Sequence, residues 1–329
     1  MDADELLMRY AAGERNFSQV NLIGANLERA NLVGINLSRA YLSTANLSRA
    51  NLKGANLSGA SLYRTNLSYA KVNEARFTEA DLTKANLKGA YLAKSLLIGA
   101  KLSGAILSGV NLSLANLCGV NLCGADLCGI NLRSANLAKA NLSWANLSGA
   151  RLSGALLRGT LLNGVQLSNA YLNGVDLNGV DLDGVNLSGA KLSGANLSGA
   201  NLTAANLTSA QLRVTLLSRA NLYAANLNEA ILSKADLCEA NLSKADLSNA
   251  DLSHADLTGA NLNMSSLRES DLSQASLRGA FLWGANLNVA DLTGADLTGA
   301  SLRGAYLGAT ELQEVTLSGA IMPDGTIHE

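Results

Sequence analysis

Few side chains in this sequence have the chemistry of an active site. Cys118, Cys123 and Cys128 form a C-x4-C-x4-C pattern, a grouping that resembles the ligand set of a soft metal ion. Each occupies the same place in successive five-residue units, so a chain that turns a corner after every unit points the three thiols in different directions and cannot close a tetrahedral site. His254 and His328 are isolated from any nucleophile or acid partner. We therefore expect no catalytic residue, no cofactor and no bound metal.

The composition narrows the class of protein further. Among 329 residues, 25 Lys and Arg balance 26 Asp and Glu, which argues against a generic nucleic-acid binder. The charge is nevertheless uneven, with a net of +5 over residues 1–101 and −6 over residues 102–329. No stretch of 18 apolar residues and no basic leader followed by an apolar run is present. With only four cysteines, we expect a cytoplasmic protein that does not enter membranes.

The elements that would have to position any site follow from one repeat. Leucine recurs at every fifth residue, and of the 62 positions from residue 17 to residue 322 only Phe17, Val72, Phe77 and Met322 depart from it. At 100° per residue, a five-residue period spreads leucines around a helix, so the helical interpretation fails. The register never slips, which predicts one solenoid without internal linkers.

Each pentad is predicted to form one extended side and one corner. Taking the leucine as position i, the residue at i−2 is mostly Ala and points inward with the leucine, while i−1, mostly Asn or Asp, points outward. Of the 31 glycines, 28 lie at i+2, where a type II turn requires a positive φ. The predicted core is represented by Leu22, Leu27, Phe77, Leu147 and Leu257.

Runs such as Ala-Asn-Leu-Ser-Gly at 195–199 and Ala-Asp-Leu-Thr-Gly at 255–259 resemble the bacterial pentapeptide-repeat family, whose motif is A(D/N)LXX. The resemblance covers residues 16–322 and implies an all-β fold, a right-handed quadrilateral parallel β-helix with four pentads per coil and about 15 coils. Residues twenty apart would then stack, roughly 4.8 Å from one coil to the next.

Both ends of the solenoid need covers, because an open coil presents unpaired backbone and bare core to water. Residues 1–15 are predicted to form a capping helix, in which Asp2 and Glu5 have the spacing of a capping box. Residues 323–329 are predicted to form a short tail over the last coil. This thin cover leaves two alternatives open: a monomer, or an end-to-end homodimer through the C-terminal coil, as the resemblance implies for some family members.

Two outward surfaces are candidates for binding a partner. The first is acidic, because carboxylates spaced by twenty residues stack in columns; it comprises Asp236, Asp251, Asp256, Asp271, Asp291, Asp296 and Glu311. The second is apolar, because large aliphatic or aromatic residues occupy outward positions; it comprises Tyr91, Leu96, Ile98, Ile106, Leu156, Leu161 and Leu216. A solvated acidic surface and scattered exposed leucines are the ordinary alternatives to function.

These observations favour a non-catalytic solenoid that serves as a protein–protein interaction scaffold or regulator in the bacterial cytoplasm, with a protein partner and no direct contact with nucleic acid or membrane. One alternative follows from the resemblance: a DNA mimic that binds a DNA-handling enzyme such as gyrase through the acidic surface. The other alternative is a structural spacer without a specific partner.

Overall fold

The chain folds with almost no regular secondary structure, as seen in a computed structural model that describes all of residues 1–329. The one helix is α1, Ala3–Ala11. The β-structure consists of isolated parallel bridges that join residue n to residue n+20, such as Asn16 to Asn36. Twenty residues are four pentads, so each coil has four sides. The structure contains no helix whose length and hydrophobicity would let it span a membrane.

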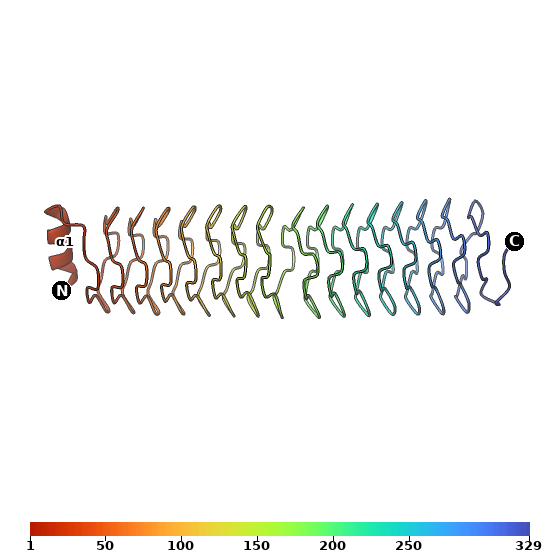
Figure 1. Ribbon diagram of the computed structural model, residues 1–329, viewed down its shortest axis with the longest axis horizontal. Helices are drawn as coiled ribbons and strands as arrows, with labels where there is room; N and C mark the ends of the chain where they lie inside the picture. The colour runs from red at the N-terminus through yellow and green to blue at the C-terminus, as the bar shows by residue number, and fades with distance from the viewer. The chain divides into compact units, whose positions relative to one another are not determined.

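Backbone contacts divide the chain into two compact units, Met1–Gln166 (unit 1) and Leu167–Glu329 (unit 2). Within unit 1 the bridges run from the Asn16–Asn36 pair to the Asn146–Gln166 pair. Within unit 2 they run from Tyr171–Lys191 to Ser301–Ile321. In each unit, Figure 1 shows coils of this kind following one another, with α1 beside the first coils of unit 1.

The pentad produces its corner through the backbone, as the glycine pattern predicted. The Leu22 N–H donates to the carbonyl of Tyr41 in the next coil at 2.8 Å, which pairs the extended side. The Ala25 N–H then closes a turn onto the Leu22 carbonyl at 3.1 Å, with Gly24 at a φ of 68°. A positive φ at the third residue is the requirement of a type II turn. Other residues accept the same conformation, for example Arg29 at 56°.

Leucine and alanine fill the interior of the coils. Leu22, Leu27, Phe77, Leu147 and Leu257 are at most 1% exposed. Burying one leucine contributes roughly 1.5 to 3 kcal/mol, so the stack as a whole is strongly stabilised. Where a hydroxyl replaces the inward alanine it finds a carbonyl, as Thr65 does with Leu42 at 2.7 Å. No buried side-chain polar atom lacks a partner.

The helix α1 covers the first coil. Asp2 caps it, its carboxylate accepting from the Glu5 N–H at 2.8 Å, and Leu6 is completely buried beneath it. The Tyr10 hydroxyl donates to the Val33 carbonyl at 2.9 Å, which ties the helix to the end of that coil. The predicted cap within residues 1–15 is therefore a nine-residue helix followed by a short connection to the first coil.

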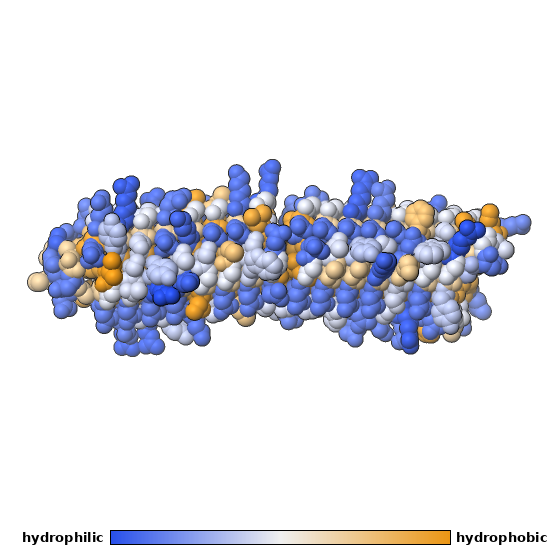
Figure 2. Space-filling view, turned by 90° about the horizontal axis from the view of Figure 1, so that it is seen from below, coloured by the Kyte–Doolittle hydropathy of each residue, from blue (hydrophilic) through white to orange (hydrophobic).

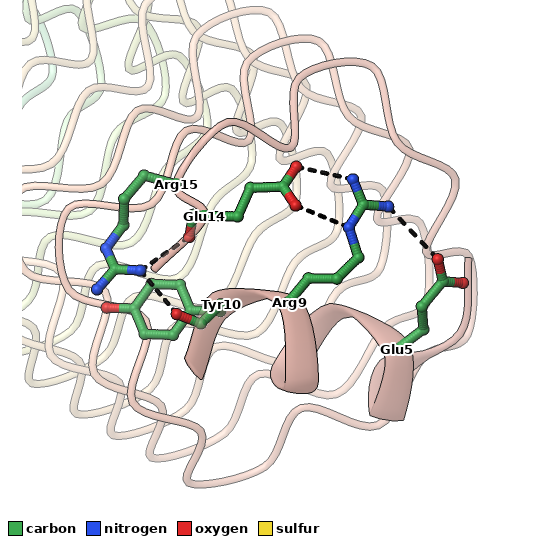
Figure 3. A network of polar contacts seen from close by, with 5 residues as sticks. All are labelled: Glu5, Arg9, Tyr10, Glu14 and Arg15. Carbon is green, nitrogen blue, oxygen red and sulfur yellow. Dashed lines mark hydrogen bonds and ion pairs between the residues drawn. The ribbon is translucent and has the colours of Figure 1, made fainter. Parts of the chain in front are cut away.

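A polar network fixes the exit from α1 (Figure 3). Two guanidinium nitrogens of Arg9 donate to the Glu14 carboxylate, each at 2.7 Å, and the third donates to the Glu5 carboxylate at 3.4 Å. This hydrogen bonding holds the pKa of the Glu14 carboxyl below its usual value and raises the pKa of Arg9. Arg15 donates to the Tyr10 and Glu14 carbonyls at 2.8 Å while its guanidinium lies 3.9 Å from the Tyr10 ring centre. The chain thus enters the first coil along a defined path.

The C-terminal tail turns back on the last coil. Ile327 forms an antiparallel bridge with Ile321, and the His328 N–H donates to the Ala320 carbonyl at 2.8 Å. The pentad before this region is irregular, because Gly308 takes the positive φ one position earlier than the pattern places it. A Cβ at Gly308 would collide with the Asn288 amide oxygen unless that side chain moved. The tail pairs with one side of the coil only.

Candidate functional site

The outward side chains at i−1 are held by the corner that follows them. In unit 2 the carboxylates of Asp251, Asp271 and Asp291 accept from the backbone N–H two residues later, at 3.0, 2.8 and 2.9 Å. This is the Asx geometry in which a short polar side chain mimics a turn of the backbone. Both Asn and Asp can make the bond, which explains why these two residues dominate this position.

Three of the predicted acidic residues form an unbroken column. Parallel bridges join Asp251 to Asp271 and Asp271 to Asp291, so their carboxylates occupy successive coils. None of the ion pairs of the structure includes any of the three. Hydroxyl donors compensate part of the charge: Thr293 donates to Asp291 at 2.6 Å and lowers the pKa of that carboxyl.

The adjacent side of unit 2 carries three more of the acidic residues, Asp236, Asp256 and Asp296. Asp236 bridges to Asp256, and the same column continues through Ser276 to Asp296. The Asp296 carboxylate is less available to a partner, because Arg278 donates a hydrogen bond to it at 2.9 Å. Hydrogen bonding from Thr298, together with that from Arg278, lowers the pKa of Asp296. Glu311 is exposed but forms no bridge to Asp291, because it follows the irregular pentad at Gly308.

We call these seven residues the acidic face: Asp236, Asp251, Asp256, Asp271, Asp291, Asp296 and Glu311. An Asn column elsewhere stabilises itself, because each amide donates to the amide oxygen one coil earlier, as Asn241 does to Asn221 at 2.9 Å. Aspartate has no such donor, so in the Asp251–Asp271–Asp291 column the ladder is replaced by stacked like charges. The sequence pattern alone did not indicate this side-chain ladder, because it shows which side chains face outward but not which atoms meet.

A small polar cluster lies within the acidic face. One ligand-type atom from each of Asp236, Cys238 and Asp256 lies within 4.8 Å of the others. The Cys238 thiol approaches the Asp256 carboxylate at 4.0 Å. Burial, then the charges of Asp256, Asp236 and Glu239, raise the pKa of the Cys238 thiol. A protonated thiol is a poor nucleophile, so we assign no nucleophilic role to Cys238.

The other cysteines lie apart from any such cluster. Cys118, Cys123 and Cys128 are unbonded thiols whose backbone N–H groups each donate to the Asn or Asp two residues earlier. They occupy three successive sides of unit 1, as their five-residue spacing requires. No arrangement of nucleophile, base and acid is present at these positions.

The predicted apolar residues do not gather into one patch. In unit 1, Leu96 and Leu156 share a column, but Asn116 and Asn136 lie between them. Leu96 is only half-buried, whereas Leu156 is 61% exposed. Leu216 belongs to unit 2, where it is 45% exposed. On the face seen in Figure 2, apolar side chains form separate spots among hydrophilic columns.

The remaining members of the apolar set, Tyr91, Ile98, Ile106 and Leu161, are 52%, 37%, 42% and 52% exposed. In unit 2 the structure exposes a further group of apolar side chains that lies outside the predicted set. Phe281 and Trp283 flank Leu282 on one side, each 53% exposed, and Met264 packs one coil earlier against Gly284. The i−1 and i+1 spacing around a buried leucine is the signal that could have identified the pair.

A family model described as pentapeptide repeats (8 copies) matches the chain in overlapping stretches that run from residue 16 to residue 324. Among solved structures, HetL from the cyanobacterium Nostoc sp. strain PCC 7120, involved in heterocyst differentiation regulation, is 31% identical over 100% of both chains, with a TM-score of 0.20. Rfr23 from the cyanobacterium Cyanothece 51142 is 28% identical over 48% of this chain and 98% of its own, with a TM-score of 0.23.

Full-length QnrB1, a plasmid-mediated fluoroquinolone resistance protein, is 19% identical over 68% of this chain and 90% of its own, with a TM-score of 0.20. No protein with a curated description matches the chain. The TM-scores are low, so kinship rests on the repeat model and on the sequence identity with HetL.

Proposed function

Because this chain belongs to the pentapeptide-repeat family, whose members fold as right-handed quadrilateral β-helices, we propose that it is a non-catalytic scaffold or regulator that binds a protein partner in the bacterial cytoplasm. The coils of each unit support this role, since most outward side chains stand on backbone that is hydrogen-bonded to a neighbouring coil. A surface ordered in advance loses little conformational entropy when it binds. The four unbonded thiols suit a reducing compartment.

The observation that carries the proposal is the unpaired column Asp251–Asp271–Asp291. Stacked like charges cost stability, and asparagine at the same positions would relieve the cost while keeping the corner bond. A partner with a basic surface supplies the missing counter-charges. The acidic face is therefore the binding surface that we propose, ahead of the scattered apolar residues around Leu96 and Leu156.

The test replaces the three aspartates of this column with asparagine. Because each Asn retains the Asx bond and can join an amide ladder, the variant should keep or raise its melting temperature while losing a partner captured from native lysate. Leu96→Asp with Leu156→Asp is the matched variant for the apolar set. Loss of the partner in the apolar variant alone would contradict the acidic face, and the absence of any enriched partner would favour the spacer.

A second candidate function, the DNA mimic, is supported by the distribution of charge. The whole chain has a formal net charge of −1, but unit 2 alone has 17 Asp and Glu against 8 Lys and Arg, a net of −9. A DNA-handling enzyme such as gyrase would then meet carboxylates where it normally meets phosphates. Competition between the chain and duplex DNA for the same enzyme tests this candidate, and simultaneous binding of both would overturn it.

The last coil supports an end-to-end homodimer over a monomer. The tail covers one side, while Leu307, Leu312 and Met322 remain half-buried, and the N–H groups of Leu307 and Leu312 have no backbone partner. Pairing of two such ends would bury apolar surface and complete backbone hydrogen bonds. Leu312→Lys should give a monomer in sedimentation equilibrium at high salt, whereas a dimer that persists there would exclude this end as the interface.

A further inference from the structure

The two units carry opposite net charge, and the charge difference between them is larger than that between residues 1–101 and residues 102–329. Unit 1 has 17 Lys and Arg against 9 Asp and Glu, a net of +8, while unit 2 has a net of −9. The change of sign coincides with the boundary at residue 166. Opposite charges of similar size on one chain favour electrostatic association between copies of that chain.

The positive charge of unit 1 is concentrated on two adjacent sides. Lysines and arginines stand there at outward positions in every coil except at residues 110–119, all of them exposed. We call six of them the basic face: Lys53, Lys71, Arg76, Lys94, Arg133 and Arg151. The only acidic residues on these sides are Glu74, which meets Lys53 at 4.0 Å, and Glu79. Most of these cations therefore have no counter-charge within the unit.

We propose that the basic face of unit 1 docks on the acidic face of unit 2 in a second copy of the chain. The coils under both faces repeat every twenty residues, roughly 4.8 Å apart. The cations lie at several outward positions of the pentad: Lys71, Arg76 and Arg151 at i−1, Lys53 and Arg133 at i+1, and Lys94 at i+2. Because the coils of both faces have the same spacing, several of these cations can meet the acidic columns at once without a residue-for-residue register. A partner with another fold has no such built-in match.

This inference goes beyond the proposed scaffold function, because that function concerns a different protein as the partner and is tested separately. A basic partner protein would compete with the second copy for Asp251, Asp271 and Asp291, so self-association also keeps this column covered while no partner is present. Exposed ion pairs are individually weak and are screened over about 10 Å at 0.1 M salt. The contact is consequently sensitive to ionic strength, unlike an apolar end-to-end dimer.

Sedimentation velocity of the full chain over a range of concentrations, at about 10 mM and at 500 mM salt, tests the proposal. We expect association at low salt that weakens on the order of tenfold or more at high salt. Reversal by Asp251→Lys, Asp271→Lys and Asp291→Lys should abolish it. Lysine is tolerated at this place in the pentad, since Lys71, Lys101 and Lys191 already occupy it.

The decisive variant combines that reversal with Lys53→Glu, Lys71→Glu and Lys94→Glu in one chain, which exchanges the two faces and should restore salt-sensitive association. The matched control is Glu229→Lys with Asp246→Lys and Glu269→Lys, which makes the same change of charge on another side of unit 2. This variant should retain most of the association at low salt. A chain that is monomeric at low salt overturns the proposal. Equal loss in the control, or no rescue by the exchange, also overturns it, because net charge would then explain the association.

Discussion

The first and last coils are built from the same pentad, yet they differ in how completely their cores are closed. In the first coil Phe17, Leu22 and Leu27 are 3%, 1% and 1% exposed beneath α1. In the last coil Leu307, Leu312 and Met322 are half-buried, and only Leu317 is buried, at 7% exposed. A leucine in this repeat is therefore buried only when its coil is covered on both sides. In a terminal coil the repeat provides one of these covers, and the other must come from a separate segment such as α1 or the tail.

The covers differ because only one of them is amphipathic secondary structure. α1 inserts Leu6 into the end of the first coil and is fixed by the Asp2 cap and the Arg9–Glu14 pair. The tail instead pairs backbone along one side, and Ile327 is 70% exposed. The first coil is thus sealed by packing, whereas the last coil is held by a strip of hydrogen bonds.

The largest expected difference comes from placing the same charge in both coils. Leu22→Lys should destabilise unit 1 by about 3 kcal/mol or more, because it removes a packed side chain and buries an unpaired ammonium. Leu312→Lys should cost less than half of that, since a half-buried position lets the ammonium reach water. Urea denaturation followed by circular dichroism measures both. Equal costs would show that the two coils are closed to the same degree.

Removing each cover's apolar contact should give the next largest difference. Leu6→Ala is expected to cost about 2 to 4 kcal/mol and to speed hydrogen exchange in the first coils, because Leu6 is fully buried. Ile327→Ala should change stability by less than about 0.5 kcal/mol. Met8→Ala, at a helix position that is 68% exposed, is the control for α1 and should be silent.

The two capping aspartates offer a smaller test. Asp2→Ala should cost about 1 kcal/mol, because it removes the acceptor of the Glu5 N–H at the start of the helix. Asp324→Ala removes the acceptor of the Thr326 N–H and hydroxyl, at 2.9 and 2.7 Å, in a tail that covers little. We expect a smaller loss of melting temperature there. A larger loss at Asp324 would mean that the tail contributes more than its burial shows.

The smallest effects are expected with pH. Hydrogen bonds to Thr293 and Thr298 lower the pKa values of Asp291 and Asp296, and the bond to Arg9 lowers that of Glu14. A carboxyl with a lowered pKa stabilises the fold fully above its unfolded pKa, near 4, and this contribution is lost as the pH falls through the folded value. Melting temperature should therefore decline below about pH 4.

The control for that titration is Thr298→Val, which removes the hydroxyl that donates to the Oδ1 atom of Asp296. It should raise the pKa of Asp296 in an NMR titration while leaving that of Glu14 unchanged. An unchanged Asp296 pKa would assign the shift to Arg278 instead.

Much of the fold could be predicted because the repeat is so regular. The inward leucines, the corners at i+2 and a helix within residues 1–15 follow from period, glycine placement and cap spacing; the structure buries Leu22 and Leu147, gives Gly24 a positive φ and forms α1 at Ala3–Ala11. The acidic column of Asp251, Asp271 and Asp291 was also predictable, since spacing by twenty residues stacks them. Glu311 was not, because the corner before it shifts to Gly308, one position earlier than the pattern places it.

By itself, the sequence determined the solenoid, its core and the sign of charge at each outward position, because a local period of five leaves the backbone one way to bury leucine. Only the tertiary structure decided which outward atoms meet: the Asx bonds, the amide ladders that aspartate interrupts, the approach of Cys238 to Asp256, and the incomplete closure of the last coil. Those contacts join residues about twenty positions apart, and their geometry depends on how neighbouring coils settle on one another.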